Sequence, residues 1–401
     1  MGKKLIGRRG FMKSTLFGVG GLFALPSMNN TQEIRTVESK GKEKKFVYRT
    51  LGKTGLKLPA INMGVMNSDN PNLVRAALDS GILLLDTAHA YMQGRNEEVI
   101  GTVIKRRPRE SFFIASKVSL PQDRTKGVYT EGATEEEFLK KLDISLKRLG
   151  VDYVDILYHH GVSRRESVVY EPVLNAMEKA KKQGKFRFPG ITTHMNEPEV
   201  VRAAADAKFY EVVLVAYNYQ QKHMTEVRDA IAYAAKAGLG IVGMKAIRGG
   251  NRLPPATRNA AAAVKWVLQD PNVHIIVPGF TTFEELETDL AVMEDITFGD
   301  KDKKALQKEA SLPSLYCQGC RQCFGQCLQN LPIPDLMRAY MYTYDYKNLP
   351  LAQDLVVSLD LPSNVCGDCV QCPVKCSEGF NVRGKIRDVV RIREVPPEFL
   401  A

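Results

Sequence analysis

Residues 81–91 read GILLLDTAHAY, in which a run of four apolar residues ends at Asp86 and Tyr91 follows five residues later. A short apolar run bounded by a glycine and a polar turn is typical of a strand buried on both faces. The stretch therefore predicts a central strand that ends in a carboxylate.

The same unit recurs along the chain as a short apolar run, a turn and an amphipathic helix. The eight apolar runs are residues 61–66, 82–85, 112–116, 153–158, 186–191, 212–217, 241–244 and 273–277. Eight such units predict an α/β fold in which parallel strands close into a (β/α)₈ TIM barrel over residues 47–300. A doubly wound sheet is the alternative, although no G-x-G-x-x-G motif follows the first run.

One predicted helix shows its own ends in the sequence. Thr134 and Glu137 have the spacing of a capping box, and Gly150 directly follows the last apolar residue, Leu149. A helix is therefore expected to begin after Thr134 and to end at Gly150.

Polar residues follow three of the predicted strands. Asp86 ends the second run, Lys117 follows the third, and His159 and His160 follow the fourth, while Tyr91 lies on the loop after Asp86. The carboxyl ends of barrel strands open onto the active site, and neighbouring strands lie about 4.8 Å apart. We therefore expect a carboxylate, a phenol, an ammonium and an imidazole in one small volume.

This combination can protonate a carbonyl oxygen. Lys117 is expected to lower the pKa of the Tyr91 phenol by favouring the phenolate, and Asp86 supplies the countercharge that a buried ammonium needs. The imidazole would orient the carbonyl while Tyr91 protonates its oxygen as hydride arrives at the carbon. Each residue taken alone also has an ordinary structural explanation. Asp86 could cap the following helix, Lys117 could be a solvated strand end, Tyr91 could pack in its loop, and one of His159 and His160 could be a hydrogen-bonded histidine at the rim of the barrel.

Several stretches resemble the aldo-keto reductase superfamily in their order and spacing, and the resemblance covers the whole predicted barrel. They are GILLLDTAHAY at 81–91, LGVDYVDILYHH at 149–160, GKFRFPG at 184–190, YN at 217–218 and VPG at 277–279. The resemblance implies a catalytic set of Asp86, Tyr91, Lys117 and His160. His160 is chosen over His159 because the family histidine falls five residues after the aspartate of the fourth strand, here Asp155.

The resemblance also implies a nicotinamide cofactor, either NADP or NAD. It places the amide contacts at Thr192 and Thr193, where family members carry Ser and Asn, and Leu214 replaces a glutamine. It places the ring-stacking position at Met244, beside Lys245. The expected phosphate contacts are made by the loop after the eighth strand, at Gly279, Phe280, Thr281 and Thr282; backbone NH groups there could hold a phosphate although the usual cations are missing.

All eight cysteines fall in the last quarter of the chain, in two C-x₂-C-x₂-C-x₃-C runs. The first is Cys317, Cys320, Cys323 and Cys327, and the second is Cys366, Cys369, Cys372 and Cys376. Such runs predict two 4Fe-4S clusters in a mainly helical, ferredoxin-like domain over residues 301–401, with helices expected between the runs at 334–359. Resemblance to two-cluster ferredoxins implies that Cys376 completes the first cluster and Cys327 the second. Zinc sites and a disulfide framework are the alternatives.

The N-terminus has the pattern of an export signal. Arg8 and Arg9 precede a glycine-rich apolar run at 14–25, which resembles a twin-arginine signal over residues 1–28. The polar residues 29–46 are expected to form a disordered tether. This pattern predicts a periplasmic protein, which only an uncleaved signal would attach to the membrane. The alternative is a basic tail without a targeting role.

The net charge of +11 does not indicate a nucleic-acid partner. Residues 1–45 hold ten Lys and Arg against three Asp and Glu, and no basic run interleaved with aromatic residues appears later. The expected function is an oxidoreductase that interconverts a small-molecule carbonyl and an alcohol by hydride transfer, coupled through the clusters to a redox partner protein. The alternative is an electron-transfer or docking subunit whose barrel has lost nicotinamide chemistry. A periplasmic binding protein is a third interpretation, but such a protein would not need the clusters.

Overall fold

The structure is a computed structural model. It describes residues 32–39, 42–123, 126–247, 259–312, 315–317, 319–359, 361–367 and 369–400. The predicted signal, residues 1–28, lies outside the described residues. None of the helices in the described ranges is long and apolar enough to cross a membrane.

The chain enters the barrel through a three-stranded antiparallel sheet. Its strands are β1 (Gln32–Ser39), β2 (Lys42–Thr50) and β3 (Lys57–Pro59). The expected tether over residues 29–46 is therefore corrected, because most of it lies in β1 and β2. Phe46 and Tyr48 in β2 are buried against the barrel, which fixes β2 and gives β1 an edge to pair with, although Ile34 stays 69% exposed.

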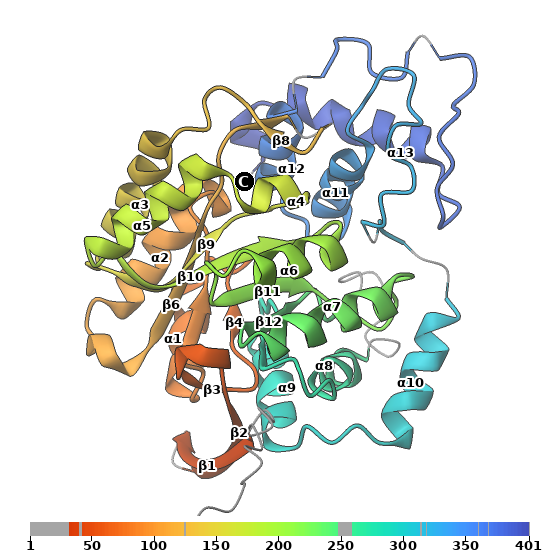
Figure 1. The fold of residues 1–401 in the computed structure, drawn as a ribbon. Helices are drawn as coiled ribbons and strands as arrows, with labels where there is room; N and C mark the ends of the chain where they lie inside the picture. The colour runs from red at the N-terminus through yellow and green to blue at the C-terminus, as the bar shows by residue number, and fades with distance from the viewer. Residues whose placement is uncertain are drawn as a thin grey trace, which may run out of the picture.

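Eight parallel strands form the central sheet (Figure 1). They are, in chain order, β4 (Met63–Gly64), β5 (Leu84–Asp86), β6 (Phe113–Val118), β9 (Val154–His159), β10 (Phe186–Thr193), β11 (Val212–Ala216), β12 (Gly240–Met244) and β13 (Ile275–Ile276). Parallel bridges from Ile61 to Ile276 and from Gly64 to Gly279 join the first strand to the last, so the sheet closes. Each predicted run overlaps one strand, and the predicted eight-stranded α/β barrel is confirmed.

Helices follow the strands and surround the sheet in Figure 1. They are α1 (Pro71–Asp79), α2 (Arg95–Ile104), α3 (Glu135–Leu149), α4 (Arg165–Val168), α5 (Glu171–Lys182), α6 (Glu197–Asp206), α7 (Met224–Lys236), α8 (Ala260–Leu268) and α9 (Phe283–Glu294). A short hairpin of β7 (Gln122–Asp123) and β8 (Val128–Tyr129) follows β6. The predicted ends of α3 are confirmed: the Thr134 side chain accepts from the Glu137 NH, and Gly150 takes a left-handed conformation at φ 68°.

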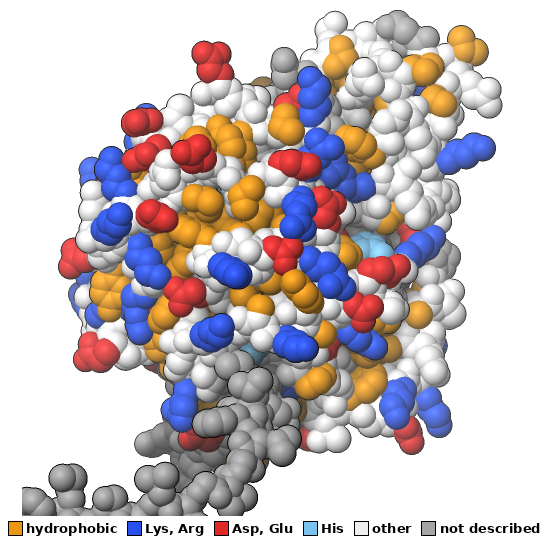
Figure 2. All heavy atoms as spheres, viewed as in Figure 1, with side chains coloured by type: hydrophobic (Ala, Val, Ile, Leu, Met, Phe, Trp, Pro, Cys, Tyr) orange, Lys and Arg blue, Asp and Glu red, His pale blue; other side chains and the backbone are white. Residues whose placement is uncertain are grey.

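The barrel has two apolar layers. One fills its interior and includes Leu84, Ile156 and Leu214, and the other lies between the strands and the outer helices. Within the interior, a Cβ on Gly190 would lie 2.4 Å from the Tyr158 ring, so only glycine leaves room for this tyrosine. The outward faces of the helices carry charges of both signs, which are interspersed in Figure 2.

Helices form the last part of the chain. They are α10 (Asp300–Ala310), α11 (Ile333–Tyr344), α12 (Leu349–Val357) and α13 (Val382–Val389), followed by the short 3-10 helices η5 (Val390–Glu394) and η6 (Pro397–Phe399). The helices expected at 334–359 are α11 and α12. Residues from α11, α12 and α13, such as Leu336, Val356 and Ile386, share a separate apolar cluster. The cysteine-bearing residues 315–400 therefore form a small unit with its own core, which we call the cysteine domain.

Candidate functional site

A buried ion pair joins the ends of two neighbouring strands. The Lys117 ammonium, 1% exposed, donates to the Asp86 carboxylate and to the Thr87 carbonyl oxygen at 2.6 Å. Burial raises the pKa of Asp86 and lowers that of Lys117, while the attraction between their charges opposes both shifts. Each charge is therefore the countercharge of the other, as the sequence predicted.

Tyr91 and His160 complete the group. Tyr91 begins the 3-10 turn η2 (Tyr91–Gly94), in which Met92 and Gln93 take left-handed backbone conformations at φ 49° and 56°. The Lys117 nitrogen lies 4.9 Å from the Tyr91 ring centroid, and the Tyr91 and His160 rings meet edge to face with centroids 6.0 Å apart. The structure thus brings together Asp86, Tyr91, Lys117 and His160.

The acidity of Tyr91 differs from expectation. Burial raises the pKa of its phenol well above its usual range, and the charge of Asp86 adds to this effect. The expected net lowering of the Tyr91 pKa is therefore wrong, because burial and the charge of Asp86 outweigh the attraction of the Lys117 ammonium, which is itself bonded to Asp86 and Thr87. Tyr91 holds its proton at neutral pH.

The two adjacent histidines have different surroundings. His159 is 1% exposed, and its ring nitrogens contact the hydroxyls of Tyr129 and, at 3.0 Å, Tyr210. Burial lowers the pKa of His159 to about 3. This imidazole is neutral and belongs to the packing, which leaves His160 to face Tyr91.

A cavity of about 1440 Å³ opens at the carboxyl ends of the strands. Asp86, Tyr91 and His194 line it, together with the loop after β13 and residues of helices α8 to α10. His194 was not predicted, although it directly follows Thr193 at the end of β10, so the strand-end rule could have found it. Burial lowers the pKa of His194 well below its usual range, and the charge of Arg338 adds to this.

The cysteine domain supplies part of the cavity wall. Its Tyr346, Asn348 and Gln353 line the cavity. The Tyr346 hydroxyl accepts from the Lys245 ammonium at 2.9 Å, and the Asn348 side chain bonds to Asn67 at 3.3 Å. No feature of the sequence indicated that this segment, far along the chain, reaches the barrel.

The predicted cofactor residues divide into two groups. Those that line the cavity are Met244, Lys245, Gly279, Phe280, Thr281 and Thr282. Thr192 and Thr193 are fully buried and do not line it. The Thr192 hydroxyl accepts from the Gly161 NH at 2.8 Å, and the Thr193 hydroxyl donates to the Met195 carbonyl at 2.7 Å. Thr192 therefore braces the loop after β9, and Thr193 the loop after β10.

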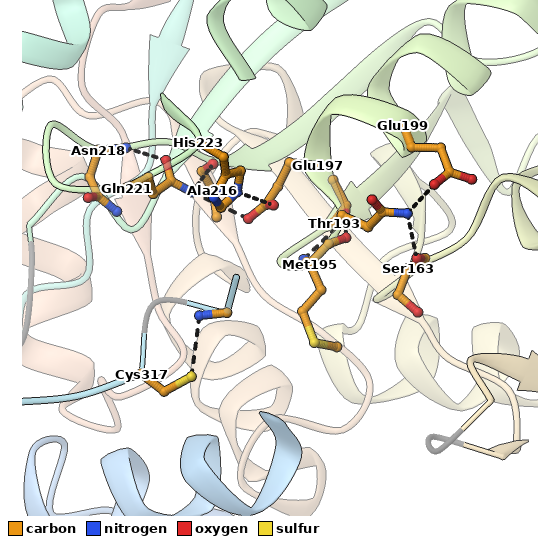
Figure 3. A network of polar contacts seen from close by, with 12 residues as sticks. Ser163, Thr193, Met195, Glu197, Glu199, Ala216, Asn218, Gln221, His223 and Cys317 are labelled. Atoms are coloured by element: carbon orange, nitrogen blue, oxygen red, sulfur yellow. Dashed lines mark hydrogen bonds and ion pairs between the residues drawn. The ribbon is translucent and has the colours of Figure 1, made fainter. Parts of the chain in front are cut away.

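Figure 3 shows the polar network around that loop. The Glu197 carboxylate bonds to His223 at 2.9 Å and to Gln221 at 3.3 Å, which ties α6 to the segment before α7. The first cysteine loop packs against the same region, because a Cβ on Gly319 would lie 3.0 Å from the His194 carbonyl oxygen. The cysteine domain is thus in contact with the end of β10.

The eight cysteines are free thiols, and one set gathers around the first run. Burial raises the pKa of Cys317 to about 12, and neighbouring Cys323 and Cys320 contribute. Burial also raises the pKa of Cys323 to about 11, with contributions from Cys320 and Cys376. The Cys320 sulfur lies 3.2 Å from the hydroxyl of Ser377, next to Cys376. The last cysteine of the second run therefore lies with the first run.

The other set joins three cysteines of the second run to the last cysteine of the first run, Cys327. Burial raises the pKa of Cys366, and Cys327, Cys372 and Cys369 add to this effect. The Cys366 NH donates to the Gln329 side chain at 3.0 Å, which holds the two loops together. Among the residues that the structure describes, no three His, Cys, Asp or Glu side chains are grouped to hold a single metal ion.

Comparison with known proteins finds relatives of the barrel. Residues 64–260 match the model of the Aldo/keto reductase family. L-glyceraldehyde 3-phosphate reductase of Escherichia coli (strain K12) is 32% identical over 163 residues, which cover 37% of this chain and 46% of that protein. L-galactose dehydrogenase of Arabidopsis thaliana is 26% identical over 307 residues, 66% of this chain and 93% of that protein.

The matched region spans about half the length of several curated relatives, including 54% of the probable aldo-keto reductase 1 of Glycine max. Among solved structures, a thermostable aldo-keto reductase is 25% identical with a TM-score of 0.52, covering 65% of this chain and 98% of that one. An aldo-keto reductase from Bacillus halodurans shares the fold with a TM-score of 0.54 at 20% identity, covering 68% of this chain and 98% of that one. The barrel of this chain is therefore similar to the aldo/keto reductase family in sequence over residues 64–260 and in fold.

Proposed function

We propose that the protein is an oxidoreductase that interconverts a small-molecule carbonyl compound and an alcohol by hydride transfer with a nicotinamide cofactor, NADP or NAD. The observation that carries this proposal is the meeting of Asp86, Tyr91, Lys117 and His160, with Asp86 and Tyr91 in the cavity wall. The match of residues 64–260 to the Aldo/keto reductase family supports the same reaction class.

Tyr91 is the proton donor in this proposal. Its raised pKa keeps the phenol protonated until the carbonyl oxygen gains charge, and an alkoxide is basic enough to take the proton. Lys117, 4.9 Å from the ring centroid, stabilises the phenolate that remains, and Asp86 keeps Lys117 charged. His160 stands at the ring edge of Tyr91, where it can orient the carbonyl group.

The cavity suits a dinucleotide. Its volume of about 1440 Å³ exceeds the ~300–1,000 Å³ of sites for drug-sized ligands, which leaves room for a cofactor and a small substrate together. Met244 and Lys245 would contact the nicotinamide end of the cofactor, and the 279–282 loop its adenosine end. A nicotinamide bound there would supply or accept the hydride.

The cysteine domain, in this proposal, holds two 4Fe-4S clusters. Cys317, Cys320, Cys323 and Cys376 would bind one, and Cys366, Cys369, Cys372 and Cys327 the other. A cubane binds each thiolate at a different iron, so its ligands need not converge on one point as zinc ligands do. The neighbouring thiols support this pairing, since Cys376 lies near Cys323 of the first run and Cys327 lies near Cys366 of the second. The clusters would exchange single electrons with a redox partner protein.

Export by the twin-arginine route to the periplasm is part of the same proposal. It rests on Arg8, Arg9 and the apolar run that follows them. Membrane attachment would require that the signal stays uncleaved.

The Tyr91→Phe variant tests the reaction. With a substrate found by screening aldehydes and alcohols, kcat is expected to fall by about 10²–10⁴-fold while nucleotide affinity is kept. Tyr233→Phe is the matched control, since Tyr233 lies on the exposed side of α7. Unchanged turnover in Tyr91→Phe would overturn the mechanism.

One observation favours the alternative of an electron-transfer or docking subunit. The hydroxyls of Thr192 and Thr193 are bonded away from the cavity, so they are not placed to hold a nicotinamide amide. Calorimetric titration of the full chain with NAD(H) and NADP(H) separates the two functions, because a docking subunit would bind neither.

A further inference from the structure

The N-terminus of α9 has its polar groups already bonded within the chain. In barrels of this kind, phosphates commonly bind at the loops after the seventh and eighth strands and at the helix N-terminus beside them. Here the Thr281 NH and hydroxyl both contact the Glu285 carboxylate, at 2.8 and 3.2 Å. The Glu285 NH donates in turn to the Thr282 hydroxyl at 3.2 Å. An incoming phosphate would have to displace a carboxylate.

The same helix presents further carboxyl groups to the cavity. Glu284, Glu285 and Asp289 line it, and α9 carries no Lys or Arg. The cations that line the cavity come from other elements, and they are Arg95, Lys245, Lys265, Lys301 and Lys347. We call the three carboxyl residues of α9 the acidic wall.

Asp289 is the informative member of the acidic wall. It is 4% exposed, lines the cavity, and has no hydrogen-bond or ion-pair partner among the residues that the structure describes. It follows Glu285 by four residues, so both side chains lie on one face of α9. A buried carboxyl group without a partner, open only to a cavity, is suited to a ligand that brings hydroxyl groups.

The chemistry of the two dinucleotides differs at one position. NAD(H) has a free 2′-hydroxyl on its adenosine ribose, which can donate to a carboxylate, whereas NADP(H) carries a phosphate dianion there, which carboxylates repel. Burial, with the nearby charge of Glu285, raises the pKa of Asp289 to about 8. Neutral Asp289 can donate to or accept from a hydroxyl, and Glu285 retains the role of acceptor.

We propose that the acidic wall of Glu284, Glu285 and Asp289 holds the hydroxyl-bearing ribose of NAD(H) and excludes the 2′-phosphate of NADP(H). The inference rests on the proposed nicotinamide function and specifies its cofactor. Its residues lie on α9 and are distinct from the Asp86, Tyr91, Lys117 and His160 group.

Dissociation constants measured by calorimetry on the full chain test the selectivity without any turnover. Wild-type protein is expected to bind NAD(H) at least about tenfold more tightly than NADP(H), the equivalent of ~1.4 kcal/mol. Glu285→Gln keeps a residue that can cap the helix, so the variant should fold normally. Its preference for NAD(H) over NADP(H), measured as the ratio of the two dissociation constants, should be several-fold smaller than that of the wild type. Asp289→Asn should weaken NAD(H) binding. Glu287→Gln is the matched control, on the exposed side of the same helix.

Each result decides one part of the question. Binding of NADP(H) as tight as that of NAD(H) overturns the selectivity and leaves the nicotinamide function standing. An unchanged NAD(H) to NADP(H) ratio in both Glu285→Gln and Asp289→Asn, with folding confirmed by circular dichroism, overturns the role of the acidic wall. Binding of neither nucleotide overturns the nicotinamide function and this inference with it.

Discussion

The hydroxyl of Tyr346 accepts a hydrogen bond from the Lys245 ammonium at 2.9 Å, and this bond joins the end of β12 to the cysteine domain at the cavity wall. Lys245 itself takes a left-handed conformation at φ 58°, which turns its side chain out of the strand direction. The two parts of the chain therefore share one cavity.

Tyr346→Phe should weaken the contact between the two parts. A hydrogen bond to a charged group contributes about 1.5–3 kcal/mol, so the free energy of unfolding should fall by an amount within this range. Tyr342→Phe is the control, because the Tyr342 ring stacks on Tyr346 with centroids 5.6 Å apart and its substitution keeps that ring contact. Chemical denaturation measures both variants, and equal losses would contradict a specific role for the Tyr346 hydroxyl.

Lys117→Met should leave the Asp86 carboxylate buried without its countercharge. Breaking a buried ion pair on one side costs about 3–5 kcal/mol, and the site also loses the cation beside Tyr91. The double variant Asp86→Asn/Lys117→Met should recover most of that stability without recovering activity. Denaturation curves and turnover of the three proteins check this, and recovery of activity in the double variant would exclude Lys117 from the chemistry.

The two histidines should respond in opposite ways to substitution. His160→Ala is expected to lower turnover by about 100-fold or more with little change in stability. His159→Ala should reduce stability by about 2–4 kcal/mol, because it leaves a cavity and removes the contacts to Tyr129 and Tyr210. A large stability loss in His160→Ala with unchanged turnover would reverse the assignment.

The free energy of unfolding should decrease at acidic pH because several histidines are buried in the neutral form. The pKa of His159 is lowered to about 3, and those of His89 and His274 to about 4, all chiefly by burial. Their folded pKa values lie below the ordinary value of 6.5, so the unfolded chain binds more protons below that pH. The stability that neutral imidazoles give is present above pH 6.5 and is lost as the pH falls toward 4 and then 3. Denaturation at several pH values should show this slope, reduced in His159→Gln.

Cluster ligation should cross between the two cysteine runs. In a background of Cys369→Ala and Cys372→Ala, anaerobic reconstitution should leave only the cluster of the first run. Adding Cys376→Ala should then remove it, whereas adding Cys327→Ala should not. Iron and sulfide analysis with electron paramagnetic resonance distinguishes these results, and loss of the cluster on adding Cys327→Ala alone would show that each run ligates its own cluster.

The barrel could be predicted because its signal is local and repeated. Apolar runs such as 82–85 and 153–158 need only their own composition to be recognised as buried strands, and Asp86, Lys117 and His160 follow from their places at strand ends. The capping pair of Thr134 and Glu137 is equally local.

Features that depend on distant contacts could not be predicted in the same way. Composition alone suggested a tether over 29–46, but β2 is held by burial against parts of the barrel made later in the chain. The acidity of Tyr91 depends on enclosure and on the bonds of Lys117, and neither is visible in the sequence. Tyr346 reaches Lys245 across about 100 residues, so neither residue alone gives a signal.

The buried Arg49 of β2 has a consequence for the order of folding. Its guanidinium donates to the carbonyl oxygen of Leu268, at the end of α8, at 2.9 Å and to that of Val273, just before β13, at 2.8 Å. A chain still being synthesised lacks these acceptors. Arg49 therefore cannot form both hydrogen bonds until the chain has been made as far as the eighth strand. We therefore expect the N-terminal strands to dock last, after the rest of the barrel has formed.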